Sequence, residues 1–281
     1  MTAYRNFVGS TPRTGILCQL CRQSTDLSRA HVPPQCAGNK AGQVVRMRPF
    51  IQNEVMSQDS PKDGGLWLKT LCRTCNGLAS KYDAAYGDLA QRAARVGRLR
   101  ETQFALPVSA SGVPPIPVSP GRVARSLLHG MVALTPSMSL VHQNFLDELL
   151  RDDEIRLPDG LQLRVARITH PQCRISSAYW MQQVLGERQN YDVFAEICFY
   201  PFIWVLCSSP SPSLGASLVD REGWGDATDW IQYNRTAVRS DLRDVLDRLP
   251  VTVHPTLRDR GKWMELSSKD RSYVLEGLIR G

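Results

Sequence analysis

The chain has 281 residues, 42% of them hydrophobic, and a formal net charge of +7. This length can bury a sizeable core in two domains, or in one domain with a large elaboration. Residues 1–17 contain no apolar run of signal-peptide length, and the longest apolar run, residues 197–207, is too short to span a membrane. We therefore expect a cytoplasmic protein without a membrane partner, whose cysteines are reduced.

Positive charge is concentrated in the first part of the chain. Residues 1–125 contain 17 Lys and Arg against 7 Asp and Glu, whereas residues 126–281 contain 17 against 20. Basic side chains attract phosphate groups, so this asymmetry favours a polyanionic partner, a nucleic acid, for the basic half.

Two C-x-x-C pairs in the basic half bracket a single histidine. Cys18 and Cys21 form the first pair, Cys72 and Cys75 form the second, and His31 lies between them. Two such pairs can complete the tetrahedral shell of four thiolates that binds zinc, so we predict one structural Zn²⁺. His31 is then a candidate general base, a zinc ligand that replaces one cysteine, or a turn residue before two prolines.

The other cysteines have no paired spacing. We expect them to be small buried hydrophobic residues or chance thiols. They are Cys36, Cys173, Cys198 and Cys207.

Elements of the basic half follow from hydrophobic periodicity. Residues 17–31 read as a turn that leads into a strand, and residues 66–71 as a second strand that runs into the second cysteine pair. Between them, residues 33–65 are polar and long for a loop, with a candidate strand at 44–48. From Cys75 to Leu99, apolar residues recur at steps of three and four, which predicts a helix.

The predicted helix carries arginines on its opposite face. Arg92, Arg95 and Arg98 recur at near-helical spacing, which is typical of a solvated face and also of a nucleic-acid contact. Residues 106–121 are rich in proline and are predicted to be a stiff linker. This divides the chain into residues 1–105, a linker, and residues 122–281.

The second half reads as mixed α+β. We predict helices over 123–134 and 139–151, a strand over 161–168, and paired strands over 194–199 and 203–206 that join at Tyr200-Pro201. A helix is expected over 241–249 and a short strand over 251–253.

Polar and aromatic residues in this half are not assigned a function. Glu196 is expected on an exposed strand face. The histidines have no ligand spacing and are expected to be surface or satisfied core residues, and the aromatic group is expected in the core rather than in a base-stacking surface. The histidines are His129, His142, His170 and His254, and the aromatic residues are Trp224, Trp230 and Tyr233.

The order of C-x-x-C, His31-Val32-Pro33 and C-x-x-C-Asn76 resembles the HNH, or ββα-metal, endonuclease superfamily over residues 15–90. The resemblance implies an α+β chain: a small zinc-stabilised ββα-metal module followed by a mixed α+β C-terminal domain. It further implies that His31 is the general base that activates water. Asn76 would help to hold one catalytic divalent cation, Mg²⁺ or Mn²⁺, while the four cysteines hold zinc.

The chain departs from the family pattern at two places. Ala30 stands where many members carry Asp, Glu or His, and Trp67 lies about where an asparagine is expected. Asn39 and Asn53 are alternative candidates for that asparagine. Asp83 is either a helix-surface carboxylate or a second ligand of the cation.

Three functions remain open at this point. The first is a metal-dependent DNA endonuclease of HNH type, in restriction, phage defence or a mobile element. Its C-terminal domain would recognise substrate, a protein partner or a regulatory signal, or would form a homo-oligomer. The second is a non-catalytic zinc-dependent nucleic-acid-binding protein. The third is an interaction protein whose zinc knuckle is purely structural.

Overall fold

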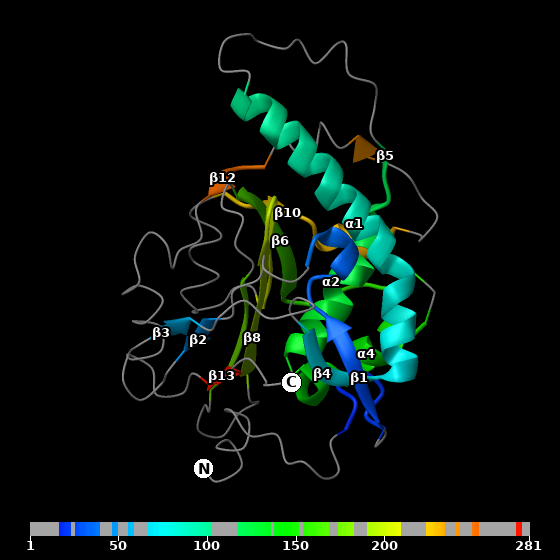
Figure 1. Cartoon of the computed structure of the whole chain (residues 1–281). Helices are drawn as coiled ribbons and strands as arrows, with labels where there is room; N and C mark the ends of the chain where they lie inside the picture. Colours follow the sequence, from blue (N-terminus) through cyan, green and yellow to red (C-terminus); the bar gives the residue numbers. More distant parts are fainter. Residues whose placement is uncertain are drawn as a thin grey trace.

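The computed structural model is α+β, as the sequence predicts, with antiparallel sheets and helices (Figure 1). It describes residues 17–23, 26–39, 47–49, 56–58, 67–102, 117–135, 138–151, 154–168, 174–182, 190–208, 223–233, 240–241, 249–252 and 274–276.

A ββα unit forms the N-terminal part. Strand β1 (Leu27–His31) pairs antiparallel with β4 (Trp67–Cys72), and helix α1 (Arg73–Thr102) follows β4 without a break. Both strands and the helix were predicted close to these bounds. Of the apolar positions that recur along α1, Tyr82, Tyr86, Leu89 and Ala93 are buried, so helix periodicity correctly identified the packed face over this part of the helix.

The segment between β1 and β4 contains three short elements. They are the 3₁₀ turn η2 (Gln35–Ala37), β2 (Met47–Pro49) and β3 (Met56–Gln58), and the last two pair with each other. The candidate strand at 44–48 overlaps β2 only in part, and its residues 44–46 lie outside the described residues.

Helix α2 (Pro120–Leu134) begins three residues before the predicted helix, because Pro120 occupies the first helical turn, where proline is favoured. Before it, β5 (Pro117–Val118) pairs with β11 (Ser240–Asp241). The helix predicted over 139–151 is instead two, α3 (Met138–Val141) and α4 (Gln143–Leu149). They are separated at His142, whose backbone, with φ −127° and ψ 44°, is not helical.

A mostly antiparallel sheet makes up the C-terminal part. Its order is β10-β6-β9-β8-β7-β13, and β12 adds parallel to β6. The bounds are β6 Leu161–Ile168, β7 Arg174–Gln182, β8 Asn190–Phe199, β9 Phe202–Ser208, β10 Gly225–Asp226, β12 Val251–Thr252 and β13 Val274–Glu276. Strand β6 and the β8–β9 hairpin confirm the predicted strands.

The prediction of a helix over 241–249 is wrong at its start. Asp241 lies in β11, where it pairs with Pro117, and Leu249 is not helical; residues 242–248 lie outside the described residues.

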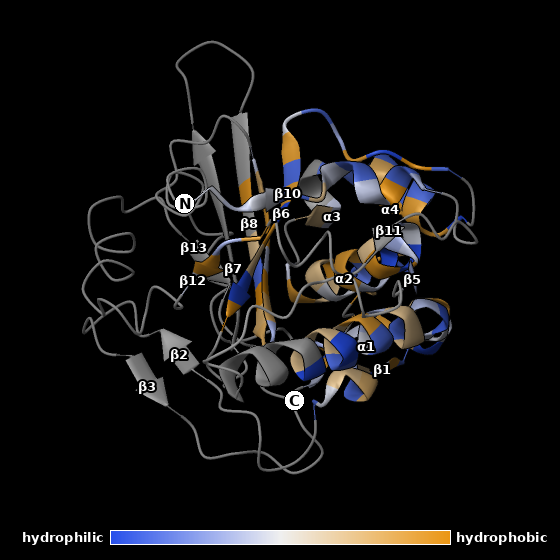
Figure 2. Cartoon of the chain, turned by 90° about the horizontal axis from the view of Figure 1, so that it is seen from above, coloured by the Kyte–Doolittle hydropathy of each residue, from blue (hydrophilic) through white to orange (hydrophobic). Residues whose placement is uncertain are grey.

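One core joins the ββα unit to the sheet. Helix α2 lies between them and is buried on nearly all sides, through residues such as Val123, Leu128 and Met131. Figure 2 shows the described helices on one side of the sheet, with hydrophobic residues along α2. Tyr86 of α1 reaches Trp204 of β9 edge-on, with ring centroids 6.5 Å apart. The hairpin, α1 and the sheet therefore share one apolar interior.

Two predictions about side chains in the sheet region have different outcomes. Glu196 is 1% exposed, not on an exposed face, because β8 is an inner strand paired on both edges and covered on its faces. Trp224 is buried as expected, and the partly buried Trp230 packs against the core, where it meets Trp204 at 5.7 Å between ring centroids. No helix in the described part of the chain is long and apolar enough to cross a membrane.

Candidate metal centre and adjoining pocket

Four cysteines that are far apart in sequence meet beside the ββα unit. The sulfur atoms of Cys18, Cys21, Cys72 and Cys75 all lie within 4.8 Å of one another, close enough to hold a metal ion. The cluster is the one that the two C-x-x-C pairs predict.

Local backbone structure places the first pair. The amide of Cys18 donates to the carbonyl of Gln23, the amide of Arg22 donates to the carbonyl of Cys18, and Arg22 adopts a φ of 61°. A left-handed residue at this point turns the chain back on itself within five residues. The amide of Gln19 then donates to the carbonyl of Thr70 in β4, which fixes this turn against the strand that carries the second pair.

The donor set and spacing fit zinc. A tetrahedral Zn²⁺ with Zn–S bonds of about 2.3 Å has S···S edges of about 3.8 Å. The Sγ atoms of Cys21 and Cys72 are 3.9 Å apart. Backbone amides also point at the sulfurs, since Cys72 N–H donates to Cys18 Sγ at 3.3 Å and Cys75 N–H to Cys72 Sγ at 3.4 Å. Such bonds are made to thiolates, the form that binds metal.

The pKa values of the cysteine thiols also indicate a site for a cation. A hydrogen bond from Cys75, aided by backbone amides, lowers the pKa of Cys18 to about 4 in spite of burial. The pKa of Cys75 is raised, chiefly because its thiol donates a hydrogen bond to Cys18 and so keeps its proton. Burial raises the pKa of Cys21. Four thiolates this close repel one another, so a divalent ion is what would let all four ionise.

The remaining cysteines lie elsewhere. Cys198 and Cys207 are buried in the sheet, as expected of small hydrophobic residues, whereas Cys36 is exposed. The Cys36 thiol donates to the backbone carbonyl of Asp83 at 3.1 Å. Cys173 lies outside the described residues.

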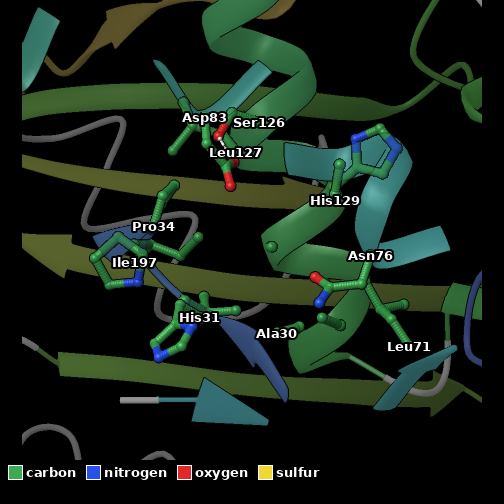
Figure 3. A pocket seen from close by; sticks show the side chains of 15 residues that line it. Ala30, His31, Pro34, Leu71, Asn76, Asp83, Ser126, Leu127, His129 and Ile197 are labelled. Atoms are coloured by element: carbon green, nitrogen blue, oxygen red, sulfur yellow. Dashed lines mark hydrogen bonds between the residues drawn. The ribbon is translucent and has the colours of Figure 1, made fainter. Parts of the chain in front are cut away.

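A pocket opens beside the metal centre, between β1, α1 and α2 (Figure 3). Its polar lining residues come from all three elements: His31 ends β1, Asn76 and Asp83 lie on α1, and Ser126 and His129 lie on α2. In Figure 3, His31 lies at one side of the pocket and the Asp83–Ser126 pair at the other. The two residues that the resemblance singles out, His31 and Asn76, therefore border one pocket.

Asn76 is held by β1. Its side-chain nitrogen donates to the backbone carbonyl of Arg29 at 3.0 Å. Because a carbonyl only accepts, this bond identifies the nitrogen and leaves Oδ1 as the acceptor end of the amide. Figure 3 shows the Asn76 oxygen directed toward the pocket.

The register of the hairpin explains the two departures around His31. His31 pairs with Trp67, so their side chains share one face, while Ala30 and Leu68 pair on the other face and are both buried. A carboxylate at position 30 would have to lie among apolar residues. Of the alternative asparagines, Asn39 is buried and donates to the carbonyl of Pro33, and Asn53 lies outside the described residues.

Asp83 is not a plain helix-surface carboxylate. It lines the pocket and accepts a hydrogen bond from the Ser126 hydroxyl at 2.9 Å. Burial raises its pKa to about 6, although the bond from Ser126 opposes the shift. Residues 76, 79 and 83 recur at helical spacing, a signal that could have placed Asp83 on the same face as Asn76.

His129 is a buried residue that sequence reasoning left unassigned. It is 2% exposed, its ring stacks on Tyr82 with centroids 5.8 Å apart, and its Nδ1 lies 2.7 Å from the carbonyl of Arg125. That contact requires a proton on Nδ1. Burial lowers the pKa of His129 to about 4, so the ring is neutral at pH 7. Nothing in the local sequence marks either His129 or Ser126 as a pocket residue.

The arginines of α1 lie away from this pocket lining. Arg92 forms an ion pair with Asp88, with Nε 2.6 Å from Oδ1, and Arg95 is exposed. Arg98 is in α1, but its side chain lies outside the described part of the chain.

Comparison of the chain with family models, with curated proteins and with solved structures found no match.

Proposed function

We propose that this chain is a divalent-cation-dependent nuclease that hydrolyses phosphodiester bonds in DNA, and that the ion in its four-cysteine cluster is a structural Zn²⁺. The observation that carries the proposal is that His31 and Asn76, on different elements, border one pocket next to that cluster. The order of these residues in the sequence is that of HNH nucleases, and the ββα arrangement agrees with it.

Zinc would have a structural task. The cluster joins the turn at residues 18–21 to the end of β4 and the start of α1. A metal cross-link between these elements would add to the free energy that fixes His31 relative to Asn76.

The chemistry of the pocket would be divided between base and ligand. His31 would accept a proton from the attacking water. Asn76 would present Oδ1, a hard oxygen donor of the type that Mg²⁺ and Mn²⁺ prefer, with its amide nitrogen held by Arg29. The bound cation would neutralise charge on the phosphate and on the leaving oxygen. The Asp83 carboxylate would add negative charge at the far side of the pocket and favour a cation there.

A second candidate, a non-catalytic nucleic-acid-binding protein, is favoured by one specific observation. Position 30, where the family often supplies a cation ligand, is a buried alanine paired with Leu68. This leaves β1 without a carboxylate beside His31, which weakens the site for a cation.

A plasmid-nicking assay separates the two functions. Wild-type protein with Mg²⁺ or Mn²⁺ should convert supercoiled plasmid to nicked and linear forms. His31→Ala should cut about 10²- to 10⁴-fold more slowly, with zinc content and DNA affinity retained. His142→Gln, which removes a half-buried histidine outside the pocket lining, serves as the matched control and should cut normally. Wild-type protein that binds DNA but never cuts it would support the binding protein instead.

A further inference from the structure

The outer face of the β1–β4 hairpin carries a row of cationic and aromatic side chains. His31 and Trp67 are directly paired, and Arg29 and Lys69 each lie two residues further along the two strands. Side chains alternate between faces of a strand, so all four lie on the face opposite the buried Ala30 and Leu68. His31, the last residue of β1, also borders the pocket. Between the pairs Ser28–Leu71 and Ala30–Leu68, β4 has one residue more than β1, which is a β-bulge. Because of this bulge, Lys69 remains exposed while Thr70 and Leu71 are both buried.

Arg29 is held in place on this face. Its guanidinium carbon lies 4.5 Å from the centroid of the Trp67 ring, a cation–π contact. Its backbone carbonyl accepts the Asn76 amide. The side chain is exposed, so the guanidinium is fixed by the ring beneath it and still presents N–H donors to solvent. A planar guanidinium that is already positioned loses little conformational entropy when it binds a phosphate with two hydrogen bonds.

Among the residues that the structure describes, the positive charge on this face is not neutralised by ion pairs. In the described part of the chain, no carboxylate forms an ion pair with Arg29 or Lys69. Arg73, the exposed first residue of α1, directly follows β4 in sequence, and the exposed Asp26 directly precedes β1. An exposed group of like charges is complementary to a polyanion.

We propose that this face binds the phosphodiester backbone of a nucleic-acid strand, with the Trp67-stacked Arg29 holding the phosphate beside His31 and Lys69 contacting a neighbouring phosphate. A guanidinium can form two hydrogen bonds with either a carboxylate or a phosphate. The aromatic ring beside it favours a nucleic acid over an acidic peptide, because the bases of a nucleic acid can stack beside the ring. The proposal extends the proposed function, since it names the substrate-binding surface next to the candidate general base. Arg29 is a substrate-positioning residue, and it acts before any bond is broken.

The test measures binding of a labelled DNA oligonucleotide by fluorescence anisotropy across a salt series, without added Mg²⁺ or Mn²⁺, so that no cleavage occurs. Arg29→Ala should weaken binding about 5- to 10-fold and reduce the slope of log affinity against log salt by about one. Arg29→Lys should keep the slope but still lose several-fold in affinity, because an ammonium group does not stack on the Trp67 ring and cannot form two parallel hydrogen bonds with a phosphate. Trp67→Phe should retain most of the affinity, whereas Trp67→Ala should lose several-fold in affinity and keep the slope, because it removes the ring beneath Arg29 and leaves the arginine charge.

Arg156→Ala is the matched control, because it removes one exposed arginine from the segment that precedes β6. Equal effects of Arg29→Ala and Arg156→Ala would overturn the proposal, as would wild-type protein that does not bind DNA. Polyglutamate that displaces the oligonucleotide as well as unlabelled DNA does would overturn the choice of a nucleic acid. If the protein binds DNA through Arg29 but never cuts it, the proposed binding surface is supported and the proposed nuclease activity is contradicted. If the protein cuts DNA equally well with and without Arg29, the nuclease activity is supported and the proposed binding surface is contradicted.

Discussion

Asn76, in the first turn of α1, donates its side-chain amide to the backbone carbonyl of Arg29 in β1 at 3.0 Å. The bond joins the helix start to the strand that ends in His31. One side chain therefore orients its own oxygen toward the pocket and holds the backbone of the arginine that stacks on Trp67. The candidate base, cation ligand and phosphate contact are connected through this single bond.

The first prediction is that one Zn²⁺ binds per chain. Cys72→Ser should release it and unfold the ββα unit, because a cluster with one thiolate removed loses most of its affinity. Cys36→Ser is the matched control, since Cys36 is exposed and outside the cluster, and it should keep its zinc. Metal analysis of the purified variants checks both. Purified wild-type protein without zinc, or a Cys72→Ser variant with a full complement, would contradict the assignment.

The second prediction concerns the ligand identity of Asn76. Asn76→Ala should raise the Mg²⁺ concentration needed for half-maximal cleavage by about 10- to 100-fold, because it removes an oxygen donor and the bond that orients it. Asn76→His should restore activity mainly with Mn²⁺, since one ring nitrogen can donate to Arg29 while the other binds a softer ion. Cation titrations of cleavage measure both effects. Identical curves for all three proteins would exclude Asn76 as a ligand.

The third prediction concerns the arginines of α1. If this helix contacts nucleic acid, neutralising Arg92, Arg95 and Arg98 should make affinity less dependent on salt. Within the set, Arg95→Ala should have a larger effect than Arg92→Ala, because Arg92 is already paired with Asp88. Salt titrations of the single variants give the ranking. Slopes identical to that of the wild type would make these arginines a solvated face.

The fourth prediction is a pH-dependent stabilisation by Asp83→Asn. The folded-state pKa of Asp83 is raised to about 6 from 3.8, so the folded chain holds an extra proton between these values. Stability therefore falls as the pH rises from 3.8 to about 6, and the full loss remains above pH 6. The variant keeps an acceptor for Ser126 and has no charge to bury. It should be more stable than wild type by about 1–3 kcal/mol at pH 8, and the gain should vanish as the pH falls toward 4.

Denaturant unfolding of both proteins at several pH values, without divalent cations, measures this gain. The comparison cancels the contribution of His129, whose lowered pKa makes stability fall as pH drops from 6.5 toward 4. Asp147→Asn, on the exposed side of α4, is the control and should show no such trend. If the difference in stability between Asp83→Asn and wild type were the same at pH 4 and pH 8, the ionised Asp83 carboxylate would not destabilise the fold and the prediction would be wrong.

Local pattern was enough to predict the parts of the fold that depend on neighbours in sequence. Strand β6 follows from an alternation over 161–168 that is interrupted once, at Val165 and Ala166, and the cysteine cluster follows from two fixed spacings. These signals are periodic or stereochemical, so they need no knowledge of what the element packs against.

The rest of the pocket depends on tertiary packing. Ser126 meets Asp83 only because α2 packs on α1, across 43 residues of chain, and no local pattern reports this. The same holds for Glu196: a glutamate in a strand usually faces solvent, but β8 lies inside the sheet. For these side chains, the position of the element in the fold overrides residue type.

The contacts of α1 and β4 show that the ββα unit depends on the second half of the chain. Tyr86 of α1 packs edge-on against Trp204, and the hydroxyl of Thr70 donates to the carbonyl of Ala133 at 2.7 Å. The partners of both residues belong to α2 and the sheet. Wherever a domain boundary is drawn, residues 15–90 moved into another protein would bring an apolar helix face with no cover and a buried hydroxyl with no acceptor. This version of the motif therefore depends on the second half of its own chain for the cover of α1 and for the acceptor of Thr70.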